Sequence, residues 1–357
     1  MILKHNSDIL FSMTEISHAL YRKYRPTQFD EVRNQEHIIR VLIGALEKKT
    51  IPHALLFTGS RGTGKTTVAR IFAHAIGAHD IDIYEIDAAS NRGIDDIREL
   101  KESVYTVPYE SPYKVYIIDE VHMLTKEAFN ALLKILEEPP QYVVFILATT
   151  EKDKVIDTII SRCQVFAFHA PTREQLRTIV LDIAKKEHYT MDTSVADIIA
   201  LSADGSYRDA IGITQKVMMA SGDTVLSVDE VAEIVGVPKT IHIRALIHAY
   251  AQHDVVGGLA VLAQIAESRV DIKLFYKILL ERIRSILLLR HNPQHIKKLA
   301  LEYSEEEINE IQAFAKGDST INARFLSSLL GYGENIGKSY IQTLPLELHL
   351  IEQCRKE

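Results

Sequence analysis

The sequence predicts an α/β domain with a parallel sheet between two layers of helices, followed by a small helical domain and a second, all-helical domain. Four short segments are strand candidates: 53–59, 81–88, 115–119 and 143–150. Of these, 115–119 is a continuous apolar run that ends in an acidic residue, and 143–150 is longer and equally apolar. Segments of helical periodicity alternate with them as far as about residue 170, an order typical of a parallel sheet covered on both faces. Beyond Pro171 the strand pattern fades, and long segments such as 269–290 have helical spacing.

Helix-start signals locate the later elements. Thr172–Gln175 and Ser227–Glu230 match the capping-box pattern, in which two residues satisfy each other's free backbone groups. Ser206 is the expected N-cap of a further helix. We therefore expect three domains: 1–170, 171–238 and 239–357.

Composition narrows the class of protein. The formal net charge is −7, so contact with nucleic acid is expected only at a local basic patch. The two cysteines, Cys163 and Cys354, form no CxxC pair, which argues against a cysteine zinc site and a disulfide framework and fits a reducing cytoplasm. No apolar run has the length of a membrane span. The first residues make a poor signal peptide. Met13 is a candidate for the true start of the protein, and residues 1–12 would then be a disordered extension ahead of it.

A glycine-rich segment follows the first predicted strand and precedes a predicted helix. Its residues are Gly59, Ser60, Arg61, Gly62, Thr63, Gly64, Lys65 and Thr66, with Thr67 next in the chain. In this context the pattern G-x-x-x-x-G-K-[ST] predicts a phosphate site, because glycines let backbone N–H groups surround an anion at a helix N-terminus. Lys65 would contact the β- and γ-phosphates of ATP, and Thr66 would ligate Mg²⁺. The alternative is a glycine-rich turn that matches by chance, which the flanking strand and helix disfavour.

An acidic pair ends the third predicted strand. That strand delivers Asp119 to the carboxyl edge of the sheet, where ligands bind in open α/β folds. We expect Asp119 to bind Mg²⁺ and Glu120 to polarise the water that attacks the γ-phosphate. On its own, a strand ending in Asp-Glu is better explained as a solvated strand end. Beside the phosphate-binding segment, the catalytic interpretation is favoured.

Four further residues have both a functional and an ordinary interpretation. Thr149 and Thr150 end the next strand, where a hydroxyl either senses the γ-phosphate or simply closes a turn. Arg162 and Arg208 are either solvated charges or the two arginines that a ring-forming ATPase needs, one from a neighbour and one from its own helical lid.

Several segments together resemble a known family. They are YRKYRPTQFDEV (21–32), GSRGTGKT (59–66), EIDAASNRGIDDIREL (85–100), VYIIDEVHMLTKEAFNALLKILEEPP (115–140), ATT (148–150), SRC (161–163) and GSYRDA (205–210). This set resembles the bacterial DNA polymerase III gamma/tau family, the AAA+ ATPase motors of clamp loaders. It is also similar to replication factor C small subunits, which share the SRC motif and the LEEPP turn. The resemblance runs from Ala19 to Val237, whereas the last domain matches in length and helical character only.

The resemblance implies individual roles. Arg162 would be an arginine finger acting in trans on the ATP of an adjacent subunit, Arg208 the sensor-2 residue on the lid, and Thr150 the sensor-1 hydroxyl. The segment Tyr24–Val32, with Tyr24, Arg25 and Val32 as its binding residues, would pack near the adenine. Positions that approach template-strand phosphates would be Asn91, Arg92 and Lys134, although Lys134 is equally explained as plain surface.

At the level of the whole protein, the resemblance implies a DNA-stimulated ATPase subunit of the DNA polymerase holoenzyme, using ATP and Mg²⁺ to load a sliding clamp onto primed template DNA. The last domain would form the collar of a pentamer with other clamp-loader subunits. The four-cysteine module usual in the family is replaced by GAHDID (77–82), so no zinc is expected. There are two alternatives. The chain could be a non-hydrolysing scaffold of the same assembly, or it could belong to another AAA+ machine such as a branch-migration helicase.

Overall fold

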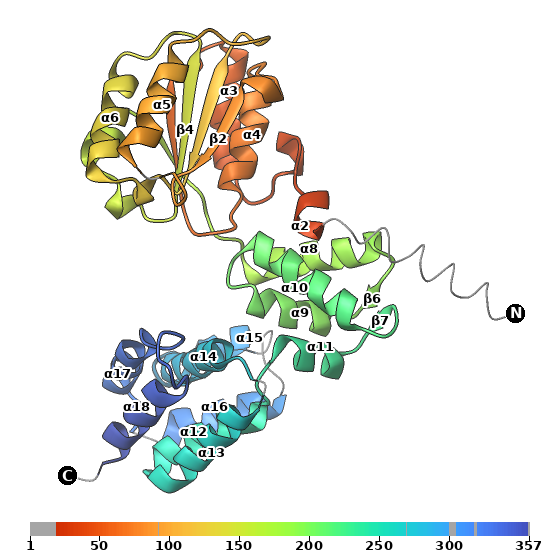
Figure 1. The fold of residues 1–357 in the computed structure, drawn as a ribbon. Helices are drawn as coiled ribbons and strands as arrows, with labels where there is room; N and C mark the ends of the chain where they lie inside the picture. Colours follow the sequence, from red (N-terminus) through yellow and green to blue (C-terminus); the bar gives the residue numbers. More distant parts are fainter. Residues whose placement is uncertain (1–18, 92, 269, 300–304, 318–319, 356–357) are drawn as a thin grey trace, which may run out of the picture. The chain divides into compact units, whose positions relative to one another are not determined.

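The computed structural model describes residues 19–91, 93–268, 270–299, 305–317 and 320–355 (Figure 1). The chain divides into two compact units, Met1–Leu226 and Ser227–Glu357. The expectations for residues 1–12, Met13 and Arg92 lie outside the described residues.

Five parallel strands form the sheet of the first unit, in the order β2-β3-β4-β1-β5. They are β1 (Ala54–Thr58), β2 (Ile83–Asp87), β3 (Lys114–Asp119), β4 (Val143–Thr149) and β5 (Gln164–Ala167). Strands β1 and β4 are buried along their whole length, which explains their continuously apolar sequences. Thr58 pairs with Thr149, and Asp87 with Asp119, so the carboxyl ends of the strands lie at one edge. The predicted α/β fold is confirmed.

Helices cover both faces of this sheet (Figure 1). The elements on one face are α3 (Glu36–Glu47) and α4 (Lys65–Ala75), and on the other α5 (Ile94–Val104), α6 (Lys126–Glu137) and α7 (Asp157–Ile160). Under the first pair, Phe57 packs with Phe72, and under the second group Tyr116 packs with Leu132 and Phe145. This three-layer arrangement follows from parallel pairing, because successive parallel strands need a crossover, usually a helix.

Three helices follow the sheet in the segment that was predicted to be the lid, and the name lid is kept for them: α8 (Arg173–Lys186), α9 (Thr193–Ser202) and α10 (Tyr207–Ala220). At the start of α8, Gln175 N–H donates to Thr172 Oγ1 (3.2 Å) and Thr172 N–H donates to Gln175 Oε1 (2.9 Å). The predicted capping box is therefore formed. Ser206 is the N-cap of α10, as predicted, and its hydroxyl accepts from the N–H of Asp209.

Small elements complete the first unit. The short helix α2 (Leu20–Lys23) is tied to α10 by a hydrogen bond from Leu20 N–H to Gln215 Oε1 (2.9 Å). Strands β6 (Thr190–Met191) and β7 (Val225–Leu226) pair in parallel. The sequence showed only a fading strand pattern beyond Pro171, and these two short strands were not predicted, because two residues are too few to produce a recognisable strand pattern.

The described part of the second unit contains helices and no strand, as predicted. Its helices are α11 (Val228–Val235), α12 (Thr240–Gln252), α13 (Val255–Glu267), α14 (Ile272–His291), α15 (Ile296–Leu299), α16 (Glu305–Gly317), α17 (Ala323–Gly333) and α18 (Leu344–Cys354). Tyr250, Phe275 and Phe325 lie in its core. The lid–collar boundary at residue 238 stays a prediction. Among the helices described, none combines the length and the apolar character that a bilayer crossing requires.

Candidate nucleotide-binding site

The loop between β1 and α4 has the backbone of a phosphate-binding loop. Gly62 and Gly64 adopt φ angles of +73° and +101°, which side-chain-bearing residues rarely adopt. A Cβ on Gly62 would also lie 1.9 Å from the hydroxyl of Ser206 on the lid. The loop then enters α4 at Lys65, so the free N–H groups of the first helical turn face the loop. This geometry explains why both positions are glycine.

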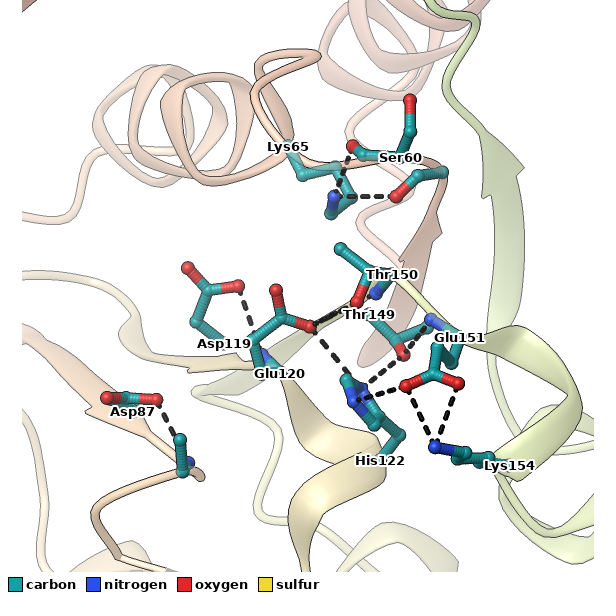
Figure 2. A network of polar contacts seen from close by, with 12 residues as sticks. Ser60, Lys65, Asp87, Asp119, Glu120, His122, Thr149, Thr150, Glu151 and Lys154 are labelled. Carbon is teal, nitrogen blue, oxygen red and sulfur yellow. Dashed lines mark hydrogen bonds and ion pairs between the residues drawn. The ribbon is translucent and has the colours of Figure 1, made fainter. Parts of the chain in front are cut away.

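Lys65 is held inside the loop. Its side chain is buried, and Nζ donates to the carbonyl oxygens of Gly59 (2.7 Å) and Ser60 (2.9 Å) (Figure 2). Burial lowers the pKa of Lys65, while the nearby carboxylates of Glu120 and Asp119 act in the opposite direction. Among the described residues, the hydrogen-bond partners of this ammonium group are neutral carbonyl oxygens, so it is suited to bind an anionic ligand.

Thr66 and Asp119 form the oxygen pair expected for a magnesium ion. The Thr66 hydroxyl donates to Asp119 Oδ2 at 2.9 Å, which joins the first turn of α4 to the end of β3. Hydroxyl and carboxylate oxygens suit Mg²⁺, which typically takes one or two protein ligands and completes its shell with phosphate oxygens and water. The donor set present therefore fits this ion.

Glu120 follows β3 in a strained backbone conformation. Its φ of +49° and ψ of +44° are left-handed, at a cost on the order of 1–2 kcal/mol for a residue with a side chain. Three contacts reach its Oε2: the N–H (3.1 Å) and hydroxyl (2.9 Å) of Thr150, and His122 Nδ1 (3.3 Å). Figure 2 shows this network. Strained backbone conformations that are held in place by surrounding contacts are common at functional sites.

Two neighbouring threonines at the end of β4 have different surroundings. Thr150 contacts Glu120 directly. Thr149 is fully buried, and its hydroxyl lies 3.0 Å from His122 Nδ1 (Figure 2). His122 also lies 3.3 Å from a carboxylate oxygen of Glu151. Thr150 is therefore the threonine that contacts Glu120, whereas Thr149 contacts His122.

A pocket lies beside the loop and includes most of the predicted nucleotide-site residues. These are Tyr24, Arg25, Val32, Arg61, Gly62, Thr63, Gly64, Lys65, Thr66, Thr67, Asp119, Glu120 and Arg208. The lid joins the loop directly, because Tyr207 N–H donates to the carbonyl oxygen of Gly62 (3.0 Å). Gly59 and Ser60 do not line the pocket, but their carbonyl oxygens accept hydrogen bonds from Lys65.

Arg162 is not brought to this pocket. It follows α7, its side chain is 34% exposed, and Nη2 makes an ion pair with Glu137 on α6 at 2.6 Å. Nη1 donates to the carbonyl oxygen of Thr158 (2.8 Å). This position excludes contact with the nucleotide pocket of the same chain in this arrangement and leaves the trans role untested.

The predicted DNA-contacting residues that the structure describes are both exposed. Lys134 lies on α6, and Asn91 follows β2, with its side-chain amide donating to the carbonyl oxygen of Asp87 (3.1 Å). Their contact with DNA remains a prediction.

Family models match two parts of the chain. Residues 77–172 match the model described as DNA polymerase III, delta subunit, and residues 226–355 match DNA polymerase III subunits gamma and tau domain III. The DNA polymerase III subunit gamma of Buchnera aphidicola is 32% identical over 335 residues, which cover 87% of this chain and 90% of that protein. The chain belongs to the DNA polymerase III gamma/tau family. A second gamma/tau relative, subunit tau of Bacillus subtilis, is 37% identical over 87% of this chain.

The chain spans 58% of the Bacillus subtilis tau subunit and 60% of the Mycobacterium tuberculosis gamma/tau subunit. Among solved structures, the Holliday junction branch migration motor RuvB of Thermotoga maritima has a TM-score of 0.51 and 21% identity, covering 70% of this chain and 86% of RuvB. This likeness supports an AAA+ fold for this gamma/tau family member. At this level of identity it does not extend to function.

Several further residues lie at the site that no sequence motif indicated. Tyr21, Ile179, Tyr207 and Ile211 line the pocket, and His122 contacts Glu120. The two isoleucines lie at helical spacings that predict only a buried face, so no local signal marked them as ligand-facing. The position of His122, two residues after Glu120, is a local signal that places the histidine near the site.

Proposed function

We propose that this chain is an ATP-hydrolysing motor subunit of a DNA polymerase III clamp loader, which loads a sliding clamp onto primed DNA. The observation that supports this most strongly is the convergence of Lys65, the Thr66–Asp119 pair and Glu120 at one edge of the sheet. Membership of the gamma/tau family supplies the replication context. The other loader subunits, in a pentamer, the clamp and primed template DNA are the proposed partners.

Each group has a proposed task. Lys65 would exchange its carbonyl partners for the β- and γ-phosphates, and the backbone N–H groups of the loop would bind the remaining oxygens. Thr66 and Asp119 would hold Mg²⁺, which supplies charge neutralisation on the phosphate oxygens when bound.

Glu120 would orient the attacking water. Among the described residues, its three contacts all fall on Oε2, which leaves Oε1 for that water. Thr150 fixes the carboxylate by donating both its N–H and its hydroxyl. A water held in line by a fixed carboxylate needs little reorganisation before attack.

The lid would couple nucleotide binding to domain movement. The pocket has a volume of about 130 Å³, smaller than the roughly 300–1,000 Å³ of typical ligand sites. We expect a bound nucleotide to widen it, and the Tyr207–Gly62 hydrogen bond is the lid contact that would separate. Arg208, on the same lid helix, would then bind the γ-phosphate and report its presence to the lid.

A non-hydrolysing scaffold is the second candidate. Such a subunit needs neither the lysine nor the acidic pair, yet all three are present and converge. A branch-migration helicase is disfavoured because the RuvB likeness is one of fold alone.

Lys65→Ala should weaken binding of an ATP analogue at least tenfold, because it removes the cation inside the phosphate loop. Calorimetric titration with the Mg²⁺ complex of the analogue measures the affinity. Lys101→Ala, on the exposed side of α5, is the matched control and should bind like the wild type. Wild-type affinity in Lys65→Ala would contradict the assignment.

Arg92→Ala combined with Lys134→Ala should flatten the salt dependence of DNA binding by the assembled loader. Each lost phosphate contact lowers the log–log slope by about one unit. Fluorescence anisotropy with primed DNA over a salt series gives the slope, and Lys185→Ala on the lid is the control. An unchanged affinity and slope would show that the assigned patch is wrong.

A further inference from the structure

A second cavity lies next to the nucleotide pocket and is lined almost entirely by arginine. It is open to solvent on one side and has a volume of about 780 Å³, and its lining residues are Tyr21, Arg22, Arg25, Arg61, Arg70 and Arg208. They come from α2 and the segment after it, from the phosphate-binding loop, from α4 and from the lid helix α10. We call this space the arginine cavity.

The charge of the arginine cavity is poorly compensated. Glu85 pairs with Arg70, with Nη2 and Oε2 2.5 Å apart. Within the described part of the chain, the other four arginines of the cavity have no carboxylate within ion-pair distance. Arg22 and Arg208 instead face the ring of Tyr21, at 5.8 and 6.0 Å from its centroid. Arg25 has a lowered pKa because of burial first, and then because of the charges of Arg70 and Arg208.

The arginine cavity extends beyond the nucleotide pocket. Arg25, Arg61 and Arg208 line both, whereas Arg22 and Arg70 line only the arginine cavity. Thr67 lines the nucleotide pocket, and Arg70 is three residues later on α4, on the same side of the helix. The arginine cavity therefore continues along α4, one turn past the phosphate-binding loop.

We propose that the arginine cavity is a second anion site, which binds phosphate groups of a small molecule beside the bound nucleotide. Its volume lies within the range of small-molecule sites, roughly 300–1,000 Å³. Guanidinium groups from separate elements surround a concave space, and their planar forks match phosphate oxygens in pairs. The phosphate comes either from free pyrophosphate or from a phosphorylated ribose of the nucleotide itself.

The test is a calorimetric titration of pyrophosphate into the full chain saturated with a non-hydrolysable ATP analogue and Mg²⁺. We expect one further site per chain. Arg22→Gln combined with Arg70→Gln should weaken this binding tenfold or more, while the affinity for the analogue stays within twofold. Arg98→Gln, an exposed arginine on α5, is the matched control and should change neither. Thermal melting verifies that the variants fold.

A second arm distinguishes the two sources of phosphate. Adenosine 5′-diphosphate 3′-diphosphate is compared with ADP in the wild type and in the double variant. A preference for the 3′-diphosphate that disappears in the double variant assigns the arginine cavity to a ribose-linked phosphate, and additional pyrophosphate binding assigns it to the free anion. The absence of both overturns the proposal, as does an equal loss of analogue affinity in the double variant, which would make the arginine cavity part of the nucleotide site.

The result is separable from the proposed function. If the wild type fails to bind the ATP analogue, the proposed ATPase fails, yet pyrophosphate titration into Lys65→Ala still tests the arginine cavity. Binding there that depends on Arg22 and Arg70 supports the second site, and binding that does not depend on them refutes it.

Discussion

Glu120→Gln should retain ATP and lose its hydrolysis, with turnover reduced on the order of 10²-fold or more. The amide keeps the size of the side chain and can still accept from Thr150 through its oxygen, so the geometry around β3 should persist. It cannot accept a proton and orients water less strongly. Thr66 and Asp119 are untouched, so binding of the Mg²⁺ complex should continue.

Single-turnover hydrolysis of radiolabelled ATP and a separate binding titration measure the two quantities. Glu151→Gln is the matched control, because Glu151 contacts the same His122 but does not line the pocket. Its turnover should remain close to that of the wild type. If Glu120→Gln turns over ATP within about twofold of the wild type, a shift of only a few tenths of a kcal/mol, Glu120 is not the catalytic base.

Arg162→Ala should reduce hydrolysis by on the order of 10³-fold in assemblies where this chain faces the nucleotide of a neighbour. Binding of ATP by the same chain should change little, since Arg162 is absent from its own pocket. The structural alternative is the ion pair with Glu137. Both side chains are partly exposed, 34% and 49%, and such pairs contribute about 0–1 kcal/mol to stability. That magnitude cannot produce the expected loss of activity.

Two comparisons separate these interpretations. Glu137→Gln removes the same ion pair but leaves Arg162 intact, so under the trans model it should hydrolyse ATP far faster than Arg162→Ala. Mixing Arg162→Ala chains with Lys65→Ala chains should give activity only at interfaces where an intact Arg162 faces an intact Lys65. The finger assignment is refuted if isolated Arg162→Ala chains lose ATP binding, or if mixtures behave like either parent.

Much of the fold could be predicted from local sequence patterns. Strand β4 is one apolar run because both its faces are covered. Thr172–Gln175 marks the start of α8 because capping depends on residues that are neighbours in sequence. Likewise, Lys65 and Thr66 are fixed by a motif whose residues are consecutive.

Contacts between distant segments were not accessible in this way. The left-handed backbone of Glu120 and its contact with Thr150 depend on strands β3 and β4 lying side by side, 30 positions apart in sequence. The pairing of Arg162 with Glu137 and the convergence of arginines on the arginine cavity likewise require the packed helices. The spacing of residues along the chain does not predict these contacts.

The proposed motor function is tested most directly by steady-state ATP hydrolysis of the purified clamp loader containing this chain, with and without sliding clamp and primed DNA. We expect slow turnover alone, a marked rise when both are added, and loss of that rise when the chain carries Glu120→Gln. Turnover that does not change on addition of clamp and primed DNA, or that persists with Glu120→Gln, would contradict the proposed motor function.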